Sequence, residues 1–96
     1  MPSQSNARWS LIRTLAQTYA LDILEALSKK PSRFSDLSLV SPNERTRAQR
    51  LKELESIGFI STVSLKVEKR YFVHYKLTDK GKEALQKMQE IDKLGG

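Results

Sequence analysis

Residues 33–77 read RFSDLSLVSPNERTRAQRLKELESIGFISTVSLKVEKRYFVHYKL, and this stretch decides the fold. A short apolar segment is followed by a Ser-Pro turn, a longer basic segment that ends at Gly58, and two runs rich in β-branched and aromatic residues. Asn43 is a favourable helix N-cap, and Gly58 suits the left-handed position that ends many helices. The sequence therefore predicts a helix over residues 43–57, between a turn and a hairpin.

The segments on either side of this helix complete the pattern. Ser35 is expected to cap a short helix over residues 36–40. Residues 59–67 and 70–77 are predicted to form the two strands of a hairpin, the wing, because β-branched and aromatic residues are frequent in both. A short helix, a turn, a longer helix and a hairpin in this order predict a winged helix-turn-helix, an α+β fold that is mostly helical.

Helices are also predicted at both ends of the chain. Residues 6–30 carry apolar residues at steps of three and four, with a break before a second helix that Thr18 would cap. Thr78 is expected to cap a last helix over residues 79–94. Gly81, in the first turn of that helix, costs up to about 1 kcal/mol relative to alanine. This cost predicts a neighbour that requires its small size.

The 96 residues carry 17 basic and 11 acidic side chains, a net charge of +6, and no cysteine. This length predicts one domain, over residues 6–94, preceded by a disordered tail at residues 1–5. A basic chain favours a polyanionic partner, and the lack of cysteine excludes disulfides, thiolate metal sites and thiol redox sensing. Because no apolar run is long enough to span a bilayer and the N-terminus has no signal-peptide core, a cytoplasmic location is expected.

The helix over residues 43–57 is predicted to present a basic face to the major groove of DNA. Its buried side is expected to consist of Ala48, Leu51, Leu54 and Ile57. Arginine can pair with guanine, and glutamine with adenine, at the base edges in this groove. The N-terminal part of such a helix enters the groove most deeply, whereas the alternative is a solvated amphipathic helix. The DNA-contacting residues predicted on the helix are Asn43, Glu44, Arg45, Thr46, Arg47, Gln49 and Arg50.

Two further groups of residues are predicted to contact phosphates. Lys66, Lys69 and Arg70 surround the turn of the wing, where a cationic tip can meet the DNA backbone or the minor groove. Arg33 and Ser35 stand at the start of the short helix, where backbone N–H groups and a cation can hold a phosphate. A solvated turn and a plain helix cap are the corresponding alternatives.

No group of residues in the sequence points to catalysis. His74 is the only histidine, and without cysteine or a carboxylate cluster beside it, it does not predict a metal site. The sequence shows no catalytic triad, no paired acid–base carboxylates and no glycine loop that could cradle a phosphate. We therefore expect neither enzyme activity nor a cofactor.

Four motifs resemble the HxlR group of archaeal and bacterial transcriptional regulators, and the wider MarR and ArsR winged-helix groups look similar. These motifs are RFSDL at residues 33–37, QRLKELE at 49–55, GFI at 58–60 and YKLTDKG at 75–81. The resemblance implies a homodimer joined through the terminal helices, with one recognition helix for each half-site of a pseudo-palindrome. The N-terminal cysteine that is usual in the family is missing, so thiol sensing is not implied.

The terminal helices are expected to supply the dimer interface. The apolar surface of residues 6–30 is wide enough to serve both a core and a partner subunit. The residues predicted to join the subunits are Trp9, Ile12, Leu15, Tyr19, Leu85, Met88 and Ile91.

One residue of the recognition helix departs from the family. Arg47 stands where such helices often place an aliphatic core residue. Two arrangements would accommodate this arginine. Either its side chain extends past the core to reach a phosphate, or the helix is rotated so that Thr46 packs inside.

Three functions remain open on the sequence alone. The first is a sequence-specific, homodimeric DNA-binding transcriptional regulator, with repression as the expected outcome. The second is an architectural, chromatin-like DNA-binding protein of low sequence specificity, which the small size and the charge of +6 would also fit. The third is a winged helix used as a protein–protein interaction module, which the arginines of the recognition helix argue against. Double-stranded DNA and a second copy of the chain are the expected partners, and no residue pattern indicates a small-molecule effector.

Overall fold

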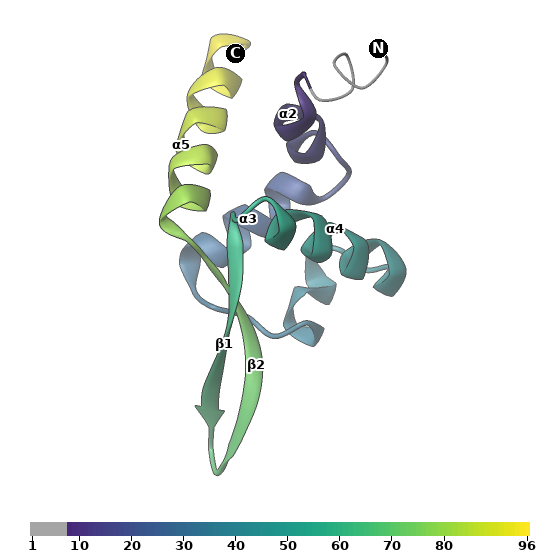
Figure 1. The fold of residues 1–96 in the computed structure, drawn as a ribbon, viewed down its shortest axis with the longest axis vertical. Helices are drawn as coiled ribbons and strands as arrows, with labels where there is room; N and C mark the ends of the chain where they lie inside the picture. The colour runs from purple at the N-terminus through teal and green to yellow at the C-terminus, as the bar shows by residue number, and fades with distance from the viewer. Residues whose placement is uncertain (1–7) are drawn as a thin grey trace.

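A computed structural model describes residues 8–96, so the tail predicted at residues 1–5 lies outside the described part. Figure 1 shows the terminal helices at one end of the molecule and a long hairpin extending from the other. The α+β class and the winged helix-turn-helix order are confirmed. The elements are α2 (Ser10–Leu15), α3 (Ala20–Lys29), the 3-10 helix η1 (Ser35–Leu39), α4 (Glu44–Ser56), β1 (Ile60–Val67), β2 (Arg70–Leu77) and α5 (Asp79–Leu94).

Helix α3 is at the centre of the fold. It packs against α2, α4, α5 and β2, and its Ile23 and Leu24 are completely buried. Around it, every other helix and both strands contribute apolar side chains to the core, the strands only from the base of the wing. These are Leu15, Leu37, Leu51, Leu54, Phe59, Ile60, Leu77 and Leu85.

Three of the predicted helix boundaries are confirmed, two by cap hydrogen bonds and one by a positive φ. The Asn43 side-chain oxygen accepts the Thr46 backbone N–H at 2.9 Å, and α4 ends before Gly58, whose φ is +80°. The Thr78 hydroxyl oxygen accepts the Gly81 N–H at 3.0 Å. A Cβ added at Gly81 would overlap the backbone carbonyl oxygen of Phe59, so the expected need for a small residue is also met.

Two predicted caps are wrong. The N-terminal region divides into α2 and α3, but the residue before α3 is Tyr19, in the left-handed conformation with φ 69°, and no side chain caps it. The hydroxyl of Ser35 does not cap the short helix either. Asp36 bends back instead, and its carboxylate accepts the Arg33 N–H at 2.9 Å. A carboxylate is the stronger acceptor of the two side chains, so it prevails over the neighbouring hydroxyl.

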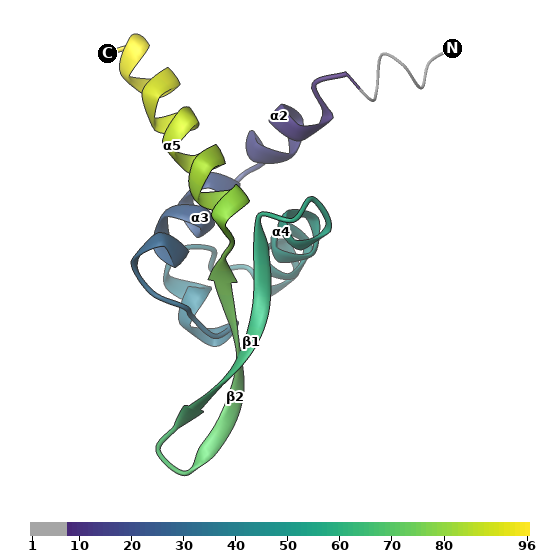
Figure 2. The same ribbon diagram turned by 60° about the vertical axis from the view of Figure 1, so that its left-hand side comes forward.

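The wing is a two-stranded antiparallel hairpin. Its register runs from Ile60 opposite Leu77 to Val67 opposite Arg70, and Glu68 adopts φ 60° in the turn. Figure 2 shows the twisted hairpin standing away from the helices at its tip. At its base, Ser32 and Tyr75 exchange two backbone hydrogen bonds of 2.9 and 2.7 Å, which fix the wing to the segment after α3. Among residues 8–96, no helix combines the length and apolar character that crossing a bilayer requires.

Candidate nucleic-acid interface

The outward face of α4 differs by one position from the predicted one. Leu51 and Leu54 are buried and Ile57 is half-buried, as expected. Ala48 is exposed, however, and Arg47 takes its predicted place in the core with only 4% of its surface exposed. The exposed residues of the helix are therefore Glu44, Arg45, Ala48, Gln49, Lys52, Glu55 and Ser56.

Arg47 does not reach toward a phosphate, which corrects the prediction that it contacts DNA. Its Nε donates to the Ser41 carbonyl at 2.8 Å, its Nη2 to the Pro42 carbonyl at 3.0 Å and its Nη1 to the Phe34 carbonyl at 3.3 Å. The guanidinium also lies 4.5 Å from the centroid of the Phe34 ring. A buried arginine is tolerated only when its N–H groups are paired. Here they donate to backbone carbonyls in and near the turn that joins η1 to α4. Neither predicted alternative holds, because Thr46 is only half-buried.

Arg50 is also turned away from the exposed face. Its Nε donates to the Thr18 carbonyl at 2.9 Å, and its Nη1 pairs with Glu53 Oε1 at 2.8 Å. Only 14% of the side chain is exposed. The prediction that Arg50 reads bases is therefore replaced by a role in attaching α4 to the junction between α2 and α3.

The other residues predicted on α4 lie where a duplex can reach them, and their contact with bases stays a prediction. Asn43, Glu44, Arg45 and Gln49 are exposed, although the oxygen of Asn43 is already used by the helix cap. Sequence reasoning missed Ala48 and Lys52, which share this face. The spacing 45, 48, 49, 52 could have identified them, since residues three and four apart are neighbours on a helix.

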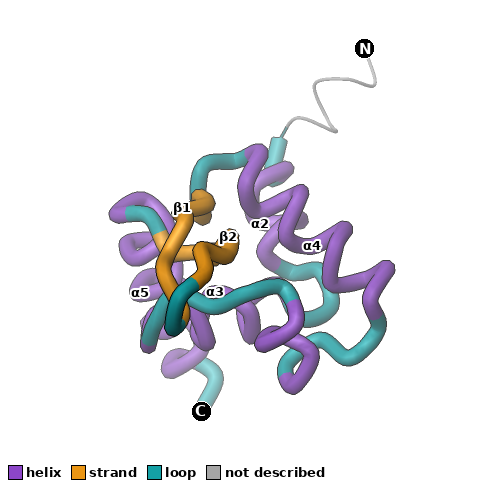
Figure 3. Tube along the Cα trace, turned by 90° about the horizontal axis from the view of Figure 1, so that it is seen from below, coloured by secondary structure: helices purple, strands orange, loops and turns teal. Residues whose placement is uncertain are grey.

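The residues predicted to contact phosphates gather between η1 and the wing. Arg33 and Arg70 both lie over the Phe72 ring, with their guanidinium carbons 4.9 and 5.6 Å from its centroid. A groove of about 740 Å³ brings Arg33 and Ser35 together with Lys66, and a second of about 560 Å³ joins Arg33 to Lys69 and Arg70. In Figure 3, seen from below, the hairpin comes toward the viewer on the left and α4 lies on the right.

The electrostatics of this end favour an anion. Residues 29–77 hold eleven Lys and Arg against five Asp and Glu, so they carry the whole net charge of +6. The pKa of Asp36 lies below its usual value, first because its carboxylate accepts the Arg33 backbone N–H and then because the Arg33 guanidinium attracts it. Partial desolvation acts in the opposite direction.

His74, the histidine of β2, is buried. Its Nδ1 lies 2.8 Å from the Phe72 carbonyl oxygen. Because a carbonyl oxygen can only accept a hydrogen bond, Nδ1 is the donor.

Comparison with protein families assigns residues 14–96 to the HxlR-like helix-turn-helix model. The chain belongs to the HxlR-like helix-turn-helix family. It is thus a DNA-binding transcriptional regulator by type, in agreement with the resemblance of its motifs. No curated protein matches the chain.

Solved structures agree with this HxlR-like assignment. The reduced form of the transcriptional regulator YodB from B. subtilis is 28% identical, with a TM-score of 0.76 over 86% of this chain and 82% of that one. A protein named as a transcriptional regulator, ytfH from Salmonella typhimurium, is 30% identical, with a TM-score of 0.71 over 88% and 77%. The transcriptional repressor BigR from Xylella fastidiosa shares the fold at 20% identity, with a TM-score of 0.69 over 95% and 88%.

The terminal helices of this HxlR-like chain expose apolar side chains. Trp9, Ile12 and Ile91 are 59%, 39% and 54% exposed, and Tyr19 and Met88 are half-buried. Leu15 and Leu85 are buried within the chain itself, which corrects their assignment to a dimer interface. Both face the core because they follow the inner stripes of α2 and α5.

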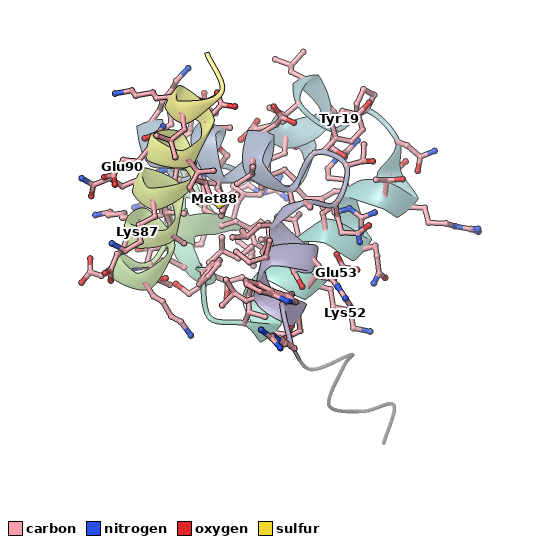
Figure 4. All side chains as sticks on the ribbon, turned by 90° about the horizontal axis from the view of Figure 1, so that it is seen from above. Tyr19, Lys52, Glu53, Lys87, Met88 and Glu90 are labelled. Atoms are coloured by element: carbon pink, nitrogen blue, oxygen red, sulfur yellow. The ribbon has the colours of Figure 1, made fainter. Side chains whose placement is uncertain are left out.

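Two grooves lie beside these exposed apolar residues. One, of about 310 Å³, runs between α2 and α5, with Ile12, Met88 and Ile91 in its lining. Another, of about 630 Å³, lies between α3 and α5 and adds Asp22 and Glu25 to an apolar floor. Figure 4 shows Met88 pointing from α5 toward the middle of the molecule, whereas Lys87 and Glu90 point outward.

Proposed function

We propose that this chain is a sequence-specific repressor that binds double-stranded DNA as a homodimer, on a pseudo-palindromic operator. The observation that carries the proposal is the exposed face of α4, which combines Arg45, Gln49 and Lys52 with the small Ala48. Arginine and glutamine supply hydrogen bonds to base edges, and an alanine methyl can contact the thymine methyl group. Such a face suits readout of bases better than indiscriminate attraction to phosphates.

The basic grooves beside the wing would supply the rest of the affinity. Arg33 and Arg70 are pre-ordered by stacking on Phe72, and Lys66 lies 5.9 Å from the centroid of the Tyr71 ring. Cations held in this way lose less side-chain entropy when they bind an anion. Contacts of this kind set the position of a protein on the duplex, whereas the base contacts of α4 would select the sequence.

A second copy of the chain is the proposed partner of the exposed apolar residues on the terminal helices, which form the apolar end of the molecule. Large exposed apolar side chains on neighbouring helices favour a protein partner. Charge complementarity supports a partner with the same sequence: Arg8 and Arg13 flank the exposed residues of α2, and Asp22 and Glu25 line the groove between α3 and α5. An isologous dimer would use both surfaces twice.

Repression is the simplest regulatory outcome for such a dimer. A bound dimer need only occupy a promoter to repress, whereas activation requires a further surface that contacts polymerase. Transcription of a reporter that carries the selected operator should fall when the protein is supplied. A rise in transcription would reverse this part of the proposal.

Selection of bound duplexes from a random DNA pool, at near-physiological salt, tests the proposed specificity. We expect enrichment of a pseudo-palindrome with half-sites about one helical turn apart. Binding without enrichment would favour the architectural alternative, which the concentration of charge in residues 29–77 also fits. No binding would favour a protein partner instead.

The dimer is tested by the substitution Ile91→Lys. A charge at this exposed apolar position should shift sedimentation toward the monomer without unfolding the chain. The matched control is Glu90→Lys, the next residue of α5, which is also exposed and points outward. A dimer that persists in Ile91→Lys would place the interface elsewhere.

A further inference from the structure

A chain of hydrogen bonds connects the α2–α3 junction to the DNA-facing side of α4. It begins at the Thr18 carbonyl, which accepts from Arg50 Nε at 2.9 Å. Arg50 Nη1 then pairs with Glu53 Oε1 at 2.8 Å. The second oxygen of that carboxylate, Oε2, accepts from Gln49 Nε2 at 2.9 Å. Both oxygens of Glu53 are therefore engaged, one by an inward residue and one by an outward residue.

The inner part of this series of hydrogen bonds is sheltered from solvent. The side chains of Arg50 and Glu53 are 14% and 29% exposed, whereas Gln49 is exposed. Salt screens a partly buried ion pair less than an exposed one. Figure 4 shows Glu53 and Lys52 close together on α4, beside α2. The carboxylate that holds Gln49 is thus itself held by a cation that is fixed to the backbone.

The backbone anchor is also well defined. Thr18 lies in the short junction where Ala20 N–H donates to the Gln17 carbonyl at 3.0 Å and Tyr19 adopts φ 69°. A tight junction of this kind offers a carbonyl whose direction is set by the fold. The Arg50 guanidinium is therefore held by a backbone carbonyl and not by another side chain.

The arrangement leaves Gln49 with a particular hydrogen-bonding pattern. A glutamine side chain has one carbonyl oxygen and two N–H donors. Glu53 takes one N–H, which leaves the carbonyl oxygen and the second N–H for another partner. Adenine presents an N6 donor and an N7 acceptor in the major groove, whereas guanine presents two acceptors there. The free groups of Gln49 match adenine and mismatch guanine.

We propose that Arg50 and Glu53 are positioning residues that hold Gln49 in the orientation that reads adenine. This inference rests on the proposed function, because it requires α4 to enter the major groove. Arg50 then contributes to specificity without touching a base. Glu53 contributes in the same way, because its carboxylate orients Gln49.

The test uses the operator selected by the wild-type chain, with each base pair of one half-site replaced in turn. Gln49→Ala should relax the preference at a single A·T pair by roughly tenfold or more, the range of a lost two-pronged contact. Glu53→Ala should relax the same pair. The double variant Gln49→Ala/Glu53→Ala should lose no more than Gln49→Ala alone, because coupled residues are not additive. Arg50→Ala should resemble Glu53→Ala at that pair.

A milder variant and a control separate positioning from folding. Glu53→Gln keeps the helix and offers one acceptor oxygen in place of two, so it should relax the same pair partially. Lys52→Ala is the matched control: it is the preceding residue, it is exposed, and it should lower affinity for every duplex without altering the preference at that pair.

Each outcome of the experiment decides the proposal. If the wild-type chain selects an operator but Glu53→Ala keeps every base preference, the positioning role is wrong and the proposed function stands. If Arg50→Ala and Glu53→Ala relax all positions equally, they act on the whole helix and the link to Gln49 is wrong. If the wild-type chain prefers no sequence, the proposed function and this inference both fail.

Discussion

The two ends of the molecule differ in what they leave exposed. The end formed by η1, α4 and the wing belongs to residues 29–77, which carry the entire net charge of +6. In the rest of the described chain, residues 8–28 and 79–96, basic and acidic side chains are equal in number. The terminal helices expose Trp9, Ile12 and Ile91 instead.

This difference supports the two proposed partners, which differ in chemistry. A concentrated positive charge attracts a polyanion over a distance that salt controls. Exposed apolar surface drives association over short range, and salt does not screen it. The two proposed interactions, with DNA at one end and with a second copy at the other, should therefore be separable by solution conditions.

The largest expected effect uses salt to separate the two ends. Between 50 and 200 mM salt, affinity for DNA should fall by roughly 10³-fold, as expected when several phosphate contacts release counterions. The dimer should change far less over the same range. Fluorescence anisotropy with labelled duplex and sedimentation without DNA would measure the two quantities. Equal sensitivity would mean that charge, not apolar surface, joins the subunits.

Gly81→Ala should lower the stability of the whole domain, because Gly81 lies where the base of the wing meets α5. The new Cβ would overlap the Phe59 carbonyl and lie 2.9 Å from Leu77 Cδ1. We expect a loss of about 3 kcal/mol in the free energy of unfolding, at the upper end for overpacking. Gly95→Ala is the control, since its Cβ would meet nothing closer than 3.7 Å. Urea denaturation would show equal stability of both variants if Gly81 had no special role.

Arg47→Leu and Arg45→Leu make the same chemical change on opposite sides of α4. The first leaves the carbonyls of Phe34, Ser41 and Pro42 without their donors and should cost about 2 kcal/mol of folding stability, as expected for buried unsatisfied acceptors. The second should leave stability unchanged and weaken operator binding by about 1–3 kcal/mol. Thermal unfolding and binding to the selected operator measure the pair. Reversed results would exchange the two assignments.

The smallest expected effect concerns pH and the Asp36 carboxylate, which lines the groove that holds Arg33, Ser35 and Lys66. Its pKa is lowered in the folded chain, so its contribution to stability is present above its unfolded value, near 3.8, and is lost as pH falls through the folded pKa. Asp36→Asn should cost less than about 1 kcal/mol at neutral pH, because the side chain is 46% exposed to solvent. The difference between the two proteins should vanish in acid. A constant difference across pH would exclude the charge as its cause.

The sequence was a good guide wherever a local rule decides the structure. Asn43, Gly58 and Thr78 mark helix ends because their side chains or φ angles act within a few residues. Gly81 could be recognised because glycine is costly in a first turn. The hairpin followed from residue types that suit strands, with ends within one residue of those expected.

The sequence was a poor guide to the arginines of α4. Helical periodicity treats arginine as outward-facing, but Arg47 is buried because three backbone carbonyls happen to meet its guanidinium. Arg50 is held by Thr18, which is 32 residues away, so no local pattern could reveal the contact. Ala48 was assigned to the core because it is apolar, although a single methyl group gains little from burial. Tertiary partners, not periodicity, decide which side of this helix is exposed.

Trp9 offers an optical consequence of the fold. It is the only tryptophan in the chain, it is 59% exposed, and it stands at the start of α2 with the Arg8 guanidinium 5.5 Å from its ring. Indole emission moves to shorter wavelength when water is excluded from the ring. The chain thus carries its own fluorophore among the exposed apolar residues of the terminal helices, and a dilution series read at one excitation wavelength can test the proposed self-association without a dye or a tag.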